Sequence, residues 1–301
     1  MSTRPPYPGS VVVGFDGSAS ALTAAQWAAA EARARGRALT LVHALVPPVT
    51  PGGLGVGLPP SPELVDAMER QAAAELDTVA AQLDAPDLLT HIAIGAASGV
   101  LLEASESADL VVVGSRGRGG FTGLLLGSVG AQVAAHGSCP TVVIRDLPTP
   151  GADGVVVGVD GSPAAMSALD FAFQAASRSG SRVIAVHAWD VPSYDLIVVP
   201  DGPVPLPLSD VADDEVRLAA EALAGFRDEY PDVTVEERLV RAPAVQALVD
   251  ASAEASLLVV GTHGRSPALG ALLGSVSHGV LHKASIPVAV VPPAPEVASA
   301  A

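Results

Sequence analysis

The sequence contains a single cysteine and a single lysine among its 301 residues. One cysteine cannot form an internal disulfide, so a reducing cytoplasm is the expected compartment. Cys139 precedes Pro140 at the start of an apolar run, and we expect it to be a small buried residue. Lys283 follows His282 and not a glycine, so the phosphate-binding pattern G-x-x-x-x-G-K-[ST] is absent. A lysine Schiff-base enzyme is poorly supported for the same reason.

Positive charge is also scarce, because 16 basic residues face 32 acidic ones and give a net charge of −16. Surfaces that bind nucleic acids or anionic membranes depend on lysine and arginine, so we expect neither partner. The first ten residues lack the apolar segment of a signal peptide. The longest uncharged run, 119–144, contains His136, Pro140 and several glycines. It predicts a loop, a helix and a strand, not a membrane span.

Glycines stand at a regular spacing in the stretch that begins at Val113. The spacing is glycine, two residues, glycine, nine residues and then Gly-Ser, met by Gly114, Gly117, Gly127 and Ser128. The same spacing recurs 147 residues later, at Gly261, Gly264, Gly274 and Ser275. Helix or strand formation alone does not require this pattern twice. An ordinary glycine-rich loop between a strand and a helix is the alternative explanation.

The second half of this pattern predicts a site for phosphate. An apolar periodic segment to His136 follows Gly127, so a helix is expected to begin there. Unpaired N–H groups at a helix start carry the positive end of the peptide dipoles and attract anions. Each loop is locally basic on an acidic protein, with Arg116 and Arg118 in the first stretch and His263 and Arg265 in the second. A positive spot of this kind admits a small anion and repels a polyanion. For Arg118 and Arg265, a solvated surface arginine is the alternative.

The whole chain repeats. Residues 155–162, VVVGVDGS, match residues 11–18, VVVGFDGS, at an offset of 144, and His187-Ala188 match His43-Ala44 at the same offset. We therefore predict two domains, 1–147 and 153–293, joined by a linker at 148–152 and followed by a flexible tail at 294–301. Basic and acidic residues number eight and thirteen in residues 1–150 (−5) and eight and nineteen in residues 151–301 (−11).

Only 3% of the residues are aromatic, while 49% are hydrophobic and largely Ala, Val and Leu. Such small apolar residues suit helices packed on a buried parallel sheet. In the first half, apolar runs predict strands at 11–15, 39–44, 91–94, 110–113 and 141–144, and helical spacing predicts helices at 19–35, 62–83, 100–106 and 128–136. Residues 46–60 and 189–209 are expected to be loops. The predicted fold is α/β: two similar open, mainly parallel five-stranded sheets flanked by helices, Rossmann-like, in tandem.

The carboxyl ends of the predicted strands gather three signals. Ligands of such sheets bind beyond these ends, where the strand order reverses. Asp16 follows the first strand, His43-Ala44 end the second and Gly114 ends the fourth. A helix N-cap is the alternative role for Asp16. His43 and His187 are more often core histidines than participants in chemistry.

Taken together, these residues resemble the nucleotide-binding branch of the universal stress protein family in a tandem form. The resemblance implies one ATP site in each half, with magnesium possible on the phosphates. The backbone of Ala44 and Ala188 would pair with adenine, in a slot lined by Val13, Val113, Val157 and Val260. Asp16 and Asp160 would face the ribose or the metal. The expected ATP-binding residues are Gly14, Asp16, Ala44, Val113, Gly114, Arg116, Gly117, Gly127, Ser128, Val129, Gly158, Asp160, Ala188, Val260, Gly261, His263, Gly264, Gly274, Ser275 and Val276.

Two functions remain open at this stage. One is a nucleotide-dependent regulatory or sensor module in stress or growth control, and the other is a slow Mg-dependent ATPase that uses the same sites. The first is favoured because, apart from Asp16 and Asp160, which are expected nearer the ribose, no carboxylate or histidine can be assigned as a base. We therefore assign no catalytic residue. His278 and His282 have the i, i+4 spacing of zinc ligands but no identified third ligand, so we assign no metal ligand. The resemblance also implies that the two halves pair through their last strands and that whole chains form a homodimer.

Overall fold

The computed structural model describes residues 7–48, 50–51, 57–58, 60–85, 87–118, 126–189, 196–199, 202–205, 208–264 and 273–294. The chain divides into two compact units, Met1–Leu147 and Pro148–Ala301. The predicted linker at 148–152 and tail at 294–301 stay predictions, and the tail beyond residue 294 lies outside the described residues.

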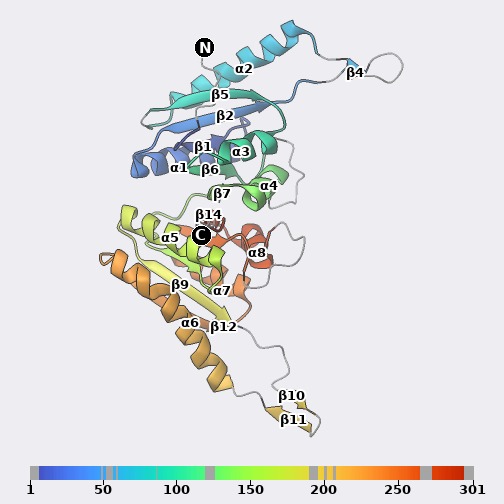
Figure 1. Cartoon of the computed structure of the whole chain (residues 1–301). Coiled ribbons are helices and arrows are strands. Elements are labelled where there is room, and N and C mark those ends of the chain that lie inside the picture. Colours follow the sequence, from blue (N-terminus) through green and yellow to red (C-terminus); the bar gives the residue numbers. More distant parts are fainter. Residues whose placement is uncertain are drawn as a thin grey trace, which may run out of the picture. The chain divides into compact units, whose positions relative to one another are not determined.

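The first unit alternates strands and helices along the chain (Figure 1). Its central strands pair in the order β7-β6-β1-β2-β5, and every pairing is parallel. The predicted α/β fold with a parallel five-stranded sheet is confirmed. The elements are β1 (Val11–Gly14), α1 (Ala19–Arg35), β2 (Leu39–Leu45), α2 (Pro62–Ala80), β5 (Leu89–Ile94), α3 (Ala97–Ser105), β6 (Leu110–Gly114), α4 (Ser128–His136) and β7 (Thr141–Ile144).

Helices cover both faces of this sheet. α1 packs on β1 and β6, and α2 packs on β2 and β5, while α3 and α4 contact each other and pack on the sheet from the opposite side. Because both faces are covered, β6 and β7 are buried from end to end except for Gly114. This explains why the strands read as continuous apolar runs without alternation.

The second unit repeats the same order with its own strands, β14-β13-β8-β9-β12, all parallel (Figure 1). α5 packs on β8 and β13, and α7 and α8 contact each other. Its elements are β8 (Val155–Gly158), α5 (Pro163–Ser179), β9 (Val183–Trp189), α6 (Leu208–Glu229), β12 (Val235–Arg241), α7 (Ala244–Ala251), β13 (Leu257–Gly261), α8 (Ser275–Lys283) and β14 (Val288–Val291).

The predicted limits of α1 are confirmed, and its two caps explain why. Ser18 Oγ accepts a hydrogen bond from the Ala21 N–H at 3.1 Å, and Gly36 ends the helix in the left-handed conformation at φ 61°. Ser162 caps α5 in the same way, accepting from the Ala165 N–H at 3.2 Å. The serine is therefore the N-cap, and the alternative role of Asp16 as the cap is wrong.

The two stretches expected to be loops contain short hairpins instead. β3 (Thr50–Pro51) pairs antiparallel with β4 (Gly57–Leu58), and β10 (Leu196–Val199) pairs antiparallel with β11 (Gly202–Pro205). The Leu-Ile-Val-Val run of β10 favours a strand because it is rich in β-branched residues. The neighbouring prolines and glycines led to the prediction of a loop instead. Several predicted ends also shift: α2 ends at Ala80, α3 begins at Ala97 and β5 begins at Leu89.

Of the helices within the described ranges, none combines the length and the apolar character that crossing a bilayer requires.

Candidate nucleotide site

Each unit holds one cavity at the carboxyl ends of its central strands. The cavity of the first unit measures about 520 Å³ and that of the second about 610 Å³. Both lie beside the point where the strand order reverses, between β1 and β6 and between β8 and β13. Volumes of this size are typical of pockets for a small molecule or cofactor.

All ten positions predicted in each half line the corresponding cavity; their contact with a nucleotide stays a prediction. In the first unit these are Gly14, Asp16, Ala44, Val113, Gly114, Arg116, Gly117, Gly127, Ser128 and Val129. In the second unit they are Gly158, Asp160, Ala188, Val260, Gly261, His263, Gly264, Gly274, Ser275 and Val276.

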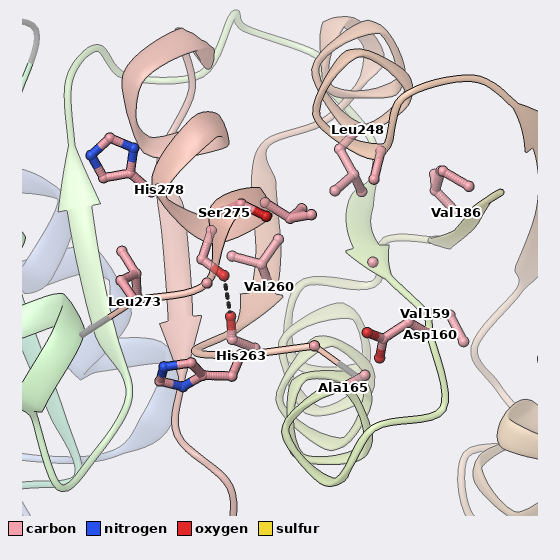
Figure 2. Close-up of a pocket in the computed structure, with 18 residues that line it drawn as sticks. Val159, Asp160, Ala165, Val186, Leu248, Val260, His263, Leu273, Ser275 and His278 are labelled. Atoms are coloured by element: carbon pink, nitrogen blue, oxygen red, sulfur yellow. Dashed lines mark hydrogen bonds between the residues drawn. The ribbon is translucent and has the colours of Figure 1, made fainter. Parts of the chain in front are cut away.

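One side of each cavity is apolar. In the second unit, Val186 and Leu248 lie on this side next to Val260, whereas His263 lies toward the other side (Figure 2). Val13 and Val157, which were expected to line the slot, are fully buried and are not among the lining residues. Successive residues of a strand point to opposite faces, so the following glycine reaches the cavity instead.

The residues that α3 and α7 contribute to the cavities were not predicted from the sequence. The offset of 147 pairs them, since Ala97 corresponds to Ala244 and Leu101 to Leu248. Ala97 lies before the predicted helix 100–106, and Leu101 lies within that helix but was not assigned to the site. Other lining residues outside the prediction are Phe15, Ala21, Val42, Arg118, Leu126, Gly130, Val159, Ala165, Val186, Leu273, Ser277 and His278.

Gly114 and Gly261 each allow the end of a strand to contact the first turn of a neighbouring helix. A Cβ at Gly114 would lie 2.8 Å from the backbone carbonyl carbon of Ser20 in α1. A Cβ at Gly261 would lie at the same distance from the carbonyl carbon of Ala164 in α5. These glycines therefore have a packing role at the cavity wall, independent of any ligand.

Gly117 and Gly264 make room for the aspartates. A Cβ at Gly117 would lie 2.6 Å from Asp16 Oδ2, and a Cβ at Gly264 would lie 2.6 Å from Asp160 Oδ2. Asp16 uses this closeness to accept hydrogen bonds from the Ser18 N–H at 2.9 Å and from the Arg118 N–H at 2.8 Å. The carboxylate thus joins the loop after β1 to the loop after β6.

The pKa of Asp16 reflects these contacts. Burial pushes the pKa upward, but the hydrogen bonds from Ser18 and from the Arg118 N–H, together with the Arg118 charge, outweigh it. The pKa is left below its usual value. Asp16 is therefore an anion at neutral pH and a weak proton acceptor.

The start of α4 presents backbone donors to the first cavity. Gly127 occupies the N-cap without a side-chain bond, and the Ala131 N–H is the first to bond within the helix, to Gly127 O at 3.0 Å. The N–H groups of residues 128–130 precede it and remain for a ligand. Gly274 and the His278 N–H form the same arrangement in α8, at 2.9 Å.

The remaining candidates from the sequence do not form a further site, although His278 lines the second cavity. His187 is 2% exposed and its Nδ1 lies 2.6 Å from Val159 O, so it belongs to the core. Cys139 is buried, and burial raises the pKa of its thiol to about 12. The His278 and His282 rings lie 4.5 Å apart, but the part of the chain that the structure describes holds no group of three residues able to bind a metal.

Comparisons with known proteins agree with the repeat. A profile of the universal stress protein family matches residues 9–145 and again residues 152–292. A universal stress protein of Mycobacterium tuberculosis is 36% identical over 306 residues, which cover 96% of this chain and 98% of that protein. One from Mycolicibacterium smegmatis is 36% identical over 291 residues, with 94% and 97% covered. The crystal structure of a universal stress protein from Archaeoglobus fulgidus shares the fold, with a TM-score of 0.67, 19% identity and 95% and 97% coverage.

We predict that Gly114→Ala destabilises the first unit, because the added methyl group would collide with the backbone of Ser20. Overpacking of this kind costs about 1–3 kcal/mol. Urea unfolding followed by Trp27 fluorescence, in a Trp189→Phe background, measures the effect. Gly99→Ala is the control, because a Cβ there meets open space within α3. Equal midpoints for Gly114→Ala and its parent would refute the packing role.

We also predict that the stabilisation by Asp16 depends on pH. A carboxylate whose folded pKa is lowered stabilises the fold above its unfolded pKa of about 3.9, and this contribution is lost as the pH falls through the folded pKa. Asp16→Asn should therefore lower the urea midpoint at pH 7 and 6, and the difference from wild type should shrink toward pH 3. A difference that stays constant over this range would contradict the assignment.

Proposed function

The chain belongs to the universal stress protein family, and we propose that each of its two units binds one molecule of ATP and acts as a nucleotide-dependent regulatory or sensor module in stress or growth control. The observation that carries this proposal is the cavity of each unit. Every position that the repeated motif marked lines it, at the carboxyl ends of a parallel sheet and beside a helix start.

The chemistry of the cavity walls supports an adenine nucleotide. In the first unit Val42, Leu101 and Val113 offer an apolar slot of the kind that a flat base requires, and the backbone of Ala44 at its rim can pair with the base edge. The phosphates would lie at the start of α4, against the N–H groups of residues 128–130, with Arg116 beside them. Val186, Leu248, Val260 and Ala188 offer the same wall in the second unit.

The residues present also fit a magnesium ion on the phosphates. Mg²⁺ is usually held by one or two carboxylates together with substrate phosphates and water. Asp16 is the carboxylate at the first cavity, ionised at neutral pH, and Asp160 is its counterpart at the second. Each would hold the ion, which would offset the phosphate charge.

The alternative, a slow ATPase, uses the same sites and is less well supported. Among the described lining residues of the first cavity, Asp16 is the one carboxylate, and its lowered pKa makes it a poor base. Arginine side chains and backbone N–H groups can stabilise charge on a phosphate, but they do not activate water. These lining residues support the binding of ATP without rapid turnover.

The remaining expectations stay predictions. These are pairing of the two units through their last strands, a homodimer, a cytoplasmic location and the lack of nucleic-acid partners. The net charge of −16 supports the last of them.

We predict two ATP molecules per chain in isothermal titration with Mg²⁺. Ala44→Phe should block the first cavity and Ala188→Phe the second, because each alanine lines its cavity and a phenyl ring would fill the apolar slot. Stoichiometry should fall from two to one in either single variant and to zero in the double variant. Circular dichroism checks that each variant is folded. A wild-type chain that binds no ATP at millimolar concentration would overturn the proposal.

We predict no ATP turnover by wild type above that of an Asp16→Ala, Asp160→Ala double variant. Phosphate release at steady state with Mg²⁺ measures it. A wild-type rate well above that of the double variant would instead establish the ATPase.

A further inference from the structure

An acidic residue of α2 holds an arginine of the first cavity. Glu75 Oε2 lies 3.2 Å from Arg118 Nη2, and Glu75 Oε1 accepts a hydrogen bond from Gln71 Nε2, also at 3.2 Å. Arg118 is one of the residues that line the cavity, on the loop that the phosphates of the proposed nucleotide would approach. An arginine of the cavity lining is therefore already paired with a carboxylate.

The backbone of Arg118 is fixed while its side chain is exposed. The Arg118 N–H donates to Asp16 Oδ2 at 2.8 Å, so the loop itself is tied to the end of β1. The side chain of Arg118 is 57% exposed and that of Glu75 is 30% exposed. The Arg118 guanidinium lies over Gly17, so any side chain at position 17 would collide with it. Gly17 itself has a φ of 78°. Rotation of the Arg118 side chain can thus break the ion pair without moving the loop.

We propose that Glu75 competes with the nucleotide phosphates for Arg118, and that occupation of the first cavity therefore releases α2 from the loop after β6. The inference rests on the proposed function of this cavity. Glu75 acts through Arg118 and is a positioning residue. It lowers the affinity of the first unit for polyphosphates and makes α2 sensitive to the ligand.

Whether Arg118 stays with Glu75 or moves to the phosphates depends on the relative strength of these two contacts. An exposed ion pair contributes little, because water screens it and two long side chains lose freedom. An arginine that donates two charge-assisted hydrogen bonds to a phosphate forms a stronger contact, and a triphosphate carries more charge than one carboxylate. Arg118 should therefore leave Glu75 when ATP enters, at a small cost to the affinity.

The second unit lacks the carboxylate at the equivalent place. Leu76 of α2 and Leu223 of α6 are both fully buried and lie 147 residues apart, which aligns the two helices. At that offset the counterpart of Glu75 is Ala222, which is 8% exposed. The competing carboxylate is therefore not repeated at this position of α6.

The test measures ATP binding to the first site of the full chain in an Ala188→Phe background, which leaves one site to titrate. Glu75→Gln removes the negative charge and keeps the shape, so ATP affinity should rise about two- to fivefold. The gain should be smaller for ADP, absent for adenosine and reduced at high salt. Asp77→Asn is the matched control, because Asp77 is an exposed acid of α2 and its loss changes the net charge equally.

A second arm separates competition from a general structural effect. In an Arg118→Gln background, Glu75→Gln should leave ATP affinity unchanged, because the residue through which it acts is gone. Hydrogen exchange of α2 should accelerate on ATP addition in the parent and not in Arg118→Gln.

Each outcome bears on one claim. If the parent binds no ATP, the proposed function fails. If the parent binds ATP but Glu75→Gln matches Asp77→Asn, or weakens binding, the competition is refuted and the proposed function stands. A gain that persists in the Arg118→Gln background also refutes it.

Discussion

One carboxylate joins two loops at the wall of the first cavity. In the first unit, Asp16 accepts N–H groups from the loop after β1 and from the loop after β6, at 2.9 and 2.8 Å. In the second unit, Asp160 accepts the equivalent first hydrogen bond, from the Ser162 N–H at 3.0 Å. Both carboxylates need a glycine opposite them, because a Cβ at Gly117 or Gly264 would lie 2.6 Å from the oxygen. The place of the cavity follows from this contact.

The same glycines serve packing and line the cavity, which accounts for their strict spacing. Gly114 lets β6 end against the backbone of α1, Gly117 admits Asp16, and Gly127 begins α4 without a side chain over its N–H groups. The alternative of an ordinary glycine-rich loop does not demand the close approaches at Gly114 and Gly117 in one segment. A motif with three separate physical reasons is a stronger sign of a built site than any single glycine.

The sequence predicted the parts with local causes and missed those without. α1 was predicted at its observed limits because Ser18 and Gly36 cap it, whereas α3 begins at Ala97 after an N-cap, Ala96, that makes no side-chain bond. The sequence of a fully apolar strand does not reveal which side chains face a cavity. Val13 was therefore predicted to line the first cavity, but it is buried and Val42 lines the cavity. The contact of Glu75 with Arg118 joins residues 43 apart and has no local signal.

Duplication keeps the backbone of the site and leaves its charged rim free to change. The strand ends, the close-packed glycines and the aspartate after the first strand recur in both units, and a side chain in place of these glycines would collide with the backbone or with the carboxylate. The rim residues have no such role, and here they differ: Arg116 faces the first cavity where His263 faces the second, and Glu75 has Ala222 as its counterpart. If each cavity takes a nucleotide as proposed, a guanidinium and an imidazole at this position would bind phosphate with different strength, and Glu75 would weaken the first site through Arg118. Two sites on one chain would then fill at different nucleotide concentrations, so the protein could report a range of them and not a single threshold.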